Sequence, residues 1–80
     1  MSKDEVLLVL TNLPDRDSAR RMAEALVGER AAACVNILPE CSSVYRWQGI
    51  TEAASETPML IKTTLAAYRR LETLIRAHHP

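Results

Sequence analysis

The two cysteines and two histidines of this 80-residue chain, Cys34, Cys41, His78 and His79, have side chains that commonly bind metals or act as nucleophiles. The two cysteines lie seven positions apart, a spacing that matches neither a CxxC redox motif nor a zinc ribbon. A secreted chain of this size usually carries four or more cysteines in a disulfide framework. We therefore interpret both cysteines as reduced thiols, at least one of which packs like a small apolar side chain.

The two histidines are adjacent, so on a helix their side chains point about 100° apart and do not readily chelate one metal ion. His78 falls on the apolar stripe of the last predicted helix, and His79 lies on the flank of that stripe. We expect His78 to be partly buried near the helix C-terminus, where a protonated imidazole is favoured. Metal ligation by His78 or His79 is kept as an alternative.

Other arrangements that carry chemistry are not visible in the sequence. There is no Ser/His/Asp arrangement, glycine-rich phosphate loop or paired-carboxylate motif, so we predict that the protein is not an enzyme. Tyr45 and Trp47 share one face of a predicted strand, which favours a role as core or interface anchors. A cleft between subunits that uses Trp47, Lys62 and Glu56 to hold a small charged ligand is a further alternative.

The composition restricts the class of partner. Ten basic and ten acidic residues give a formal net charge of zero, which argues against nucleic-acid binding and makes self-association easier. Apolar residues make up 48% of the chain, an ordinary value for a globular protein. No apolar run approaches the roughly 20 residues of a membrane span, and the charged start does not resemble a signal peptide. We expect a soluble, cytoplasmic protein that does not interact with membranes.

Patterning predicts the first half of the fold. The apolar run Val6–Leu10 is typical of a strand that is buried on both faces. Asp15 or Asp17 can cap the helix that follows, which has one apolar stripe and ends near Gly28. The next strand lies within residues 31–39, and alternation there places Cys34, Asn36 and Leu38 opposite Ala33, Val35 and Ile37.

The second half is predicted in the same way. A strand over residues 43–47 is followed by a turn at Gln48 and Gly49, and residues 50–56 are ambiguous between helix and strand. Met59–Thr63 reads as a strand with Pro58 at its start or on an edge. The last element is a helix from about Thr64 to His79 with an apolar stripe of Tyr68, Leu71, Leu74 and Ile75.

The order β-α-β-β-α, with middle strands that are long and bulged, predicts one α+β domain over residues 1–80. It is the split βαβ pattern of a ferredoxin-like sandwich whose final strand is missing or supplied elsewhere. That strand normally lies beside the first, so its absence leaves Val6–Leu10 as an apolar edge that invites pairing with another chain.

Several blocks of this sequence resemble the CutA family, the divalent-cation tolerance proteins. They occur in the family's order and cover nearly the whole chain: Leu8–Thr11, Glu29–Ile37 with its Ala-Ala-Cys-Val-Asn core, Pro39, Ser43–Gly49, Glu56, Ile61–Thr63 and His78–Pro80. The combination of Ala-Ala-Cys-Val-Asn with Tyr-Arg-Trp and Ile-Lys-Thr is quite specific. In the family, the chain continues after His-His-Pro with a strand and a C-terminal helix.

The resemblance implies a PII-like homotrimer in which the long middle strands pair between subunits. It also implies binding of copper or another divalent cation and a role in metal tolerance, and it marks Cys34 as the copper ligand. A thiolate is a soft ligand that suits Cu(I). Two alternatives remain: a small-ligand signalling module that uses the clefts between subunits, and a structural protein that anchors or assembles a partner.

Overall fold

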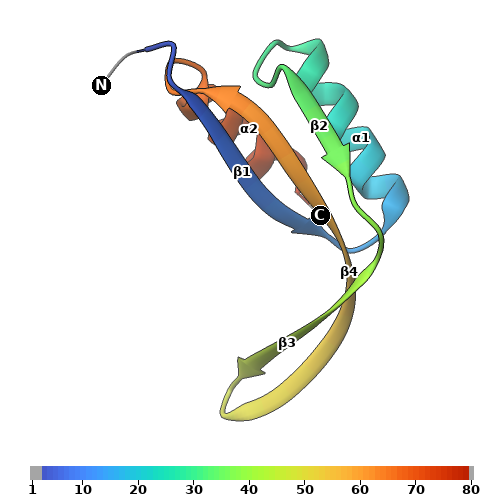
Figure 1. Ribbon diagram of the computed structural model, residues 1–80. Helices are drawn as coiled ribbons and strands as arrows, with labels where there is room; N and C mark the ends of the chain where they lie inside the picture. Colours follow the sequence, from blue (N-terminus) through green and yellow to red (C-terminus); the bar gives the residue numbers. More distant parts are fainter. Residues whose placement is uncertain (1–2, 80) are drawn as a thin grey trace.

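The computed structural model describes residues 3–79, so Pro80, the last residue of the His78–Pro80 block, lies outside the described part. The elements follow the predicted order, except that the stretch after the turn at Gln48 and Gly49 is a single long strand over residues 50–64 (Figure 1). They are β1 (Val6–Leu13), α1 (Arg16–Gly28), β2 (Cys34–Ile37), β3 (Cys41–Trp47), β4 (Ile50–Thr64) and α2 (Tyr68–His78).

Three strands form an antiparallel sheet in the order β1-β4-β2, and both helices lie against the same face of it (Figure 1). This is the ferredoxin-like arrangement without its final strand, and β1 is an edge strand as predicted. The prediction that β1 is buried on both faces is wrong. Val6, Leu8 and Leu10 are 64–70% exposed, because only the alternate residues face the helices.

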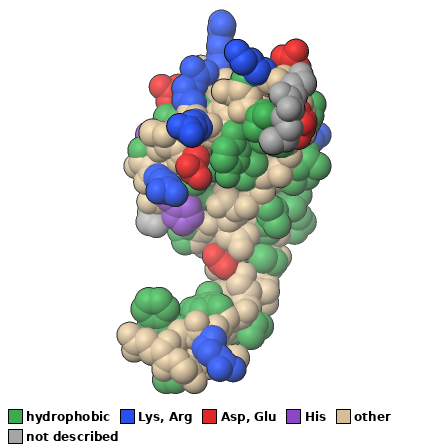
Figure 2. Space-filling model, turned by 90° about the vertical axis from the view of Figure 1, so that its left-hand side faces the viewer, with side chains coloured by type: hydrophobic (Ala, Val, Ile, Leu, Met, Phe, Trp, Pro, Cys, Tyr) green, Lys and Arg blue, Asp and Glu red, His purple; other side chains and the backbone are tan. Residues whose placement is uncertain are grey.

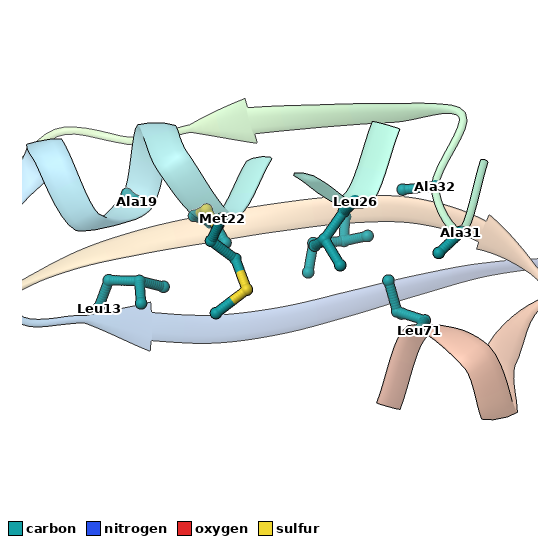
Figure 3. Packing of buried hydrophobic residues seen from close by; sticks show 9 residues of the cluster. Leu13, Ala19, Met22, Leu26, Ala31, Ala32 and Leu71 are labelled. Atoms are coloured by element: carbon teal, nitrogen blue, oxygen red, sulfur yellow. The ribbon is translucent and has the colours of Figure 1, made fainter. Parts of the chain in front are cut away.

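The core fills the space between the sheet and the helices (Figure 3). Met22 and Leu26 of α1 point toward the sheet, and Leu71 of α2 packs into the same core from the second helix. Nine apolar residues are buried there: Leu13, Ala19, Met22, Leu26, Ala31, Ala32, Met59, Ile61 and Leu71. In so small a domain, this thin layer is the whole hydrophobic core among the described residues.

Strands β2 and β3 are two parts of one path along β4, separated by a bulge. Leu38 to Glu40 face only Thr57 and Pro58 of β4, so the pairing register shifts by one residue. Beyond the bulge, β3 and the first half of β4 form a hairpin that projects from the body (Figure 1). Gln48 and Gly49 have φ values of 50° and 78°, which makes the predicted turn a type I′ turn.

Two sequence predictions about β4 need correction. The ambiguous residues 50–56 are strand, because pairing with β3 outweighs the helical preference of Ala53 and Ala54. Pro58 is neither at the start of a strand nor on an edge strand, but inside β4 opposite Asn12. On the β2 side the Leu38 N–H still donates to the Pro58 carbonyl oxygen at 2.9 Å, but Pro58 has no N–H to donate in return, and the regular β2 pairing ends one residue earlier, at Ile37 and Met59.

Both ends of α1 have identifiable caps. The Asp15 carboxylate accepts a hydrogen bond from the Ser18 backbone N–H at 2.7 Å, which confirms Asp15 as the N-cap. That bond is the main cause that holds the pKa of Asp15 below its usual value, helped by the Arg21 charge. At the other end, Arg30 adopts φ 60°. Its backbone N–H donates a hydrogen bond to the Val27 carbonyl oxygen, and the Ala31 N–H donates to the Leu26 carbonyl oxygen. These two bonds define a Schellman motif with Arg30 at the left-handed position.

Helix α2 begins later than predicted. Thr64 is still paired with Val6 in the sheet, and its hydroxyl accepts a hydrogen bond from the Ala67 N–H at 3.3 Å. The chain turns there, so the helix starts only at Tyr68. Among the described residues, no helix has the length and apolar character that crossing a membrane requires.

The positive φ of Arg30 generates a stability prediction. A left-handed conformation costs a residue with a side chain about 1–2 kcal/mol, and glycine adopts it without that cost. Glycine also increases the entropy of the unfolded chain, so we expect Arg30→Gly to stabilise the protein by about 0.5–1 kcal/mol net. Urea unfolding measures the change, with Glu29→Gly as the control, because Glu29 has an ordinary φ of −92°. A stabilisation by Glu29→Gly that equals that of Arg30→Gly would contradict the strain interpretation.

Candidate functional site

The sheet face that the helices leave uncovered, called here the open face, carries the candidate metal ligand Cys34. Alternation along β2 directs Val35 and Ile37 toward the core and Cys34 away from it. Cys34 is half-buried and free of any disulfide. The sequence prediction that Cys34 lies on the face opposite Val35 and Ile37 therefore agrees with the structure.

A lysine lies directly beside this thiol. Lys62 of β4 is the register partner of Cys34 on β2 and also of Leu8 on β1, so the three form one row across the open face. The next row consists of Leu10, Leu60 and Asn36. Sequence reasoning did not identify this neighbour of Cys34, because the residues are 28 positions apart and only the strand register brings them together.

The two histidines are far from this row. They end α2, whose side of the sheet is opposite to the open face (Figure 1). His78 is exposed, so the prediction of a partly buried packing residue is wrong; the α2 residues that pack against the core are Leu71, Leu74 and Ile75. His79 Nε2 lies 2.9 Å from the Asn12 carbonyl oxygen. The chain fold thus does not bring His78 or His79 together with Cys34.

His78 instead borders a cavity of about 160 Å³ between α1 and α2, together with Ser18, Arg21 and Met22. Within the described residues, no group of three or more His, Cys, Asp or Glu side chains is placed to hold a metal ion. Cys34 thus belongs to no such group in the described part of the chain.

The projecting hairpin exposes large apolar side chains (Figure 2). Tyr45 is 43% exposed and Trp47 is 60% exposed, so neither is a core anchor of the single chain. The Tyr45 hydroxyl donates a hydrogen bond to Glu52 Oε2 at 3.2 Å. This bond to the Glu52 carboxylate raises the pKa of Tyr45, with desolvation and the Glu56 charge as smaller causes.

The alternative cleft of Trp47, Lys62 and Glu56 is not formed within one chain. Trp47 pairs with Ile50 at the hairpin tip, and Lys62 lies twelve residues further along the same strand. At about 3.3 Å per residue, the strand separates those two positions by roughly 40 Å before bending is considered. Cys41 is also remote from Cys34; its Sγ lies 4.0 Å from Ser43 Oγ at the base of the hairpin.

The chain is thus a small α+β protein with a ferredoxin-like sheet, helices on one face of that sheet only, and a long projecting hairpin. Comparison with known proteins narrows this class. The family model of the CutA1 divalent ion tolerance proteins matches residues 7–80. The chain belongs to this family, which confirms the resemblance seen in the sequence.

Individual relatives agree. A divalent-cation tolerance protein CutA of Thermus thermophilus is 47% identical over 91% of this chain and 71% of its own length. One of Yersinia pestis is 38% identical over all of this chain and 67% of its own length. The crystal structure of CutA1 from a Shewanella species has a TM-score of 0.93 at 40% identity, covering 99% of this chain and 74% of that one. The matched relatives are therefore longer than the present 80 residues.

The Tyr45 contact generates a prediction about the hairpin. Replacing Glu52 by glutamine removes the negative charge that disfavours the phenolate, so the pKa of Tyr45 should fall toward its usual value of about 10. Ultraviolet titration in a Tyr68→Phe background isolates Tyr45, because the chain has two tyrosines. Glu56→Gln serves as the control and should lower this pKa less. Equal pKa values before and after Glu52→Gln would mean that the hydrogen bond is absent in solution.

Proposed function

We propose that the protein is a cytoplasmic homotrimer that binds copper or another divalent cation through Cys34 and acts in metal tolerance, without enzymatic activity. The single observation that carries the metal-binding part is the position of Cys34, a half-buried free thiol on the open face of the sheet. Membership of the divalent ion tolerance family supports the wider role. Thiolate sulfur is a soft ligand with a preference for copper.

Exposed apolar surface supports the trimer. Val6, Leu8 and Leu10 form an apolar row along β1, and Val44, Trp47 and Ile50 are each at least 60% exposed on the hairpin. Contiguous exposed apolar patches mark interaction sites, and a lone two-stranded hairpin is only marginally stable in water. We propose that other copies of the chain cover both surfaces, which also places Cys34 at or near the contact between subunits.

The chain has two cysteines, fewer than the four or more that a secreted protein of this size usually carries, which supports the cytoplasmic part of the proposal. A role as a small-ligand signalling module is the second candidate. It depends on clefts between subunits, since Trp47, Glu56 and Lys62 do not meet within one chain. A thermal-shift screen separates the two, because a ligand at 100 times its dissociation constant stabilises the protein by about 2.7 kcal/mol. Stabilisation by nucleotides but not by metals would favour the second candidate.

Substitution of Cys34 tests the metal-binding proposal. Loss of a residue that only orients a metal ligand typically weakens metal binding by at least about tenfold. We expect loss of the ligand itself, in Cys34→Ala, to weaken copper binding by at least this factor. Equilibrium dialysis against buffered copper measures the affinity, and circular dichroism checks that each variant is folded. Cys41→Ala is the matched control, because it removes the other half-buried thiol. Copper affinity that is unchanged in Cys34→Ala, or reduced only in Cys41→Ala, would refute the role of Cys34.

A further inference from the structure

The first turns of α1 and the last turn of α2 border a cavity that the metal-binding proposal does not use. It has a volume of about 160 Å³ and is lined by Ser18, Arg21, Met22 and His78. Ser18, Arg21 and Met22 are spaced three and four residues apart, so they lie on one face of α1. His78 borders the cavity from the other helix. Three side chains that can donate hydrogen bonds therefore line the same space.

Ser18 is the buried polar group of this cavity. It is 9% exposed, and its hydroxyl oxygen accepts a hydrogen bond from Arg21 Nη2 at 3.3 Å. A hydroxyl can also donate one hydrogen bond, and the bonds formed within residues 3–79 include none that the Ser18 hydroxyl donates. Because buried polar groups are normally paired, an acceptor that enters the cavity would complete the hydrogen bonding of Ser18.

Arg21 supplies a positive charge that no carboxylate contacts directly. Among residues 3–79 its guanidinium forms no ion pair, and its one hydrogen bond goes to Ser18. The pKa of Asp15 is lowered mainly by hydrogen bonding to Ser18 and less by the Arg21 charge, so this carboxylate is committed to capping α1. Asp17 lines a different cavity. Most of the five N–H donors of Arg21 are therefore available to a ligand.

The ends of the two helices contribute to the same field. The N-terminal turn of α1 carries a partial positive charge that favours anions. The C-terminus of α2 has the opposite sign, but its last turn carries the basic residues Arg76 and His78. His78 is exposed, and an imidazole has at least one N–H donor in either protonation state. Met22, which is 2% exposed, gives the cavity an apolar wall, and a lower local dielectric strengthens polar contacts beside it.

We propose that this cavity binds a phosphoryl oxyanion, either inorganic phosphate or the phosphate group of a small metabolite, through Arg21, Ser18 and His78. Arginine binds phosphate oxygens through pairs of parallel N–H bonds. A carboxylate offers two oxygens, whereas a phosphoryl group offers three or four and can accept from all three side chains. A cavity of about 150 Å³ holds a molecule as large as benzene, so the present one has room for a phosphoryl group. The site does not include Cys34 and needs no metal ion.

Isothermal titration calorimetry with inorganic phosphate and with glycerol phosphate, at constant ionic strength and without metal, tests the proposal. We expect saturable binding to the wild-type protein. Arg21→Gln should weaken it at least about tenfold, because hydrogen bonds from a charged group contribute at least this much. Ser18→Ala removes a neutral donor and should weaken binding about fivefold. Arg20→Gln is the matched control, since Arg20 is the adjacent exposed arginine of α1 and lines other cavities.

The two ligands distinguish the two sources of the phosphoryl group. Tighter binding of glycerol phosphate would support a phosphorylated metabolite, and tighter binding of inorganic phosphate would support the free ion. No saturable binding of either ligand to the folded wild-type protein would overturn the proposal. Equal weakening by Arg20→Gln and Arg21→Gln would also overturn it, because it would reveal unspecific attraction to a basic surface. Circular dichroism checks that each variant is folded, and Cys34→Ala should bind phosphate like the wild type.

Discussion

Both helices cover the same face of the sheet, and the other features of this chain depend on that constraint. Alternation along each strand sends Val9, Ile61 and Val35 to the helices and leaves Leu8, Lys62 and Cys34 on the open face. The core is therefore a single thin layer, and no element of the described residues covers the apolar side chains of the open face. The same alternation that builds the core puts the one candidate thiol ligand on the exposed side.

The long strand β4 connects this sheet to the projecting hairpin. Its second half is the central strand of the body, and its first half pairs with β3. Strand β4 thus contributes both to the open face and to the hairpin, where it pairs with the β3 residues Tyr45 and Trp47, so a partner that covers one surface is held in register with the other. The proposed trimer and the proposed metal site depend on each other for this reason.

Sequence patterns predicted the order of elements, an N-cap at Asp15 or Asp17, the hairpin turn and the placement of Cys34 on the face opposite Val35 and Ile37, because each depends on local chemistry or on simple alternation. They did not predict which apolar residues stay exposed. Val6, Leu8 and Leu10 have the composition of a doubly buried strand, and hydrophobicity alone does not tell a core face from a face that binds another chain. The Lys62 neighbour and the separation of His78 from Cys34 depend on register and topology, which local patterns do not contain.

The molecular mass in solution tests the central claim most directly, namely that other copies of the chain cover the open face and the hairpin. Sedimentation equilibrium of the 8.9 kDa chain should give three times that mass, independent of protein concentration over the measured range. Replacing Leu8 and Leu10 by lysine should lower the mass, because charged side chains on the open face oppose its burial. A folded wild-type protein that sediments as a monomer of 8.9 kDa would contradict the claim.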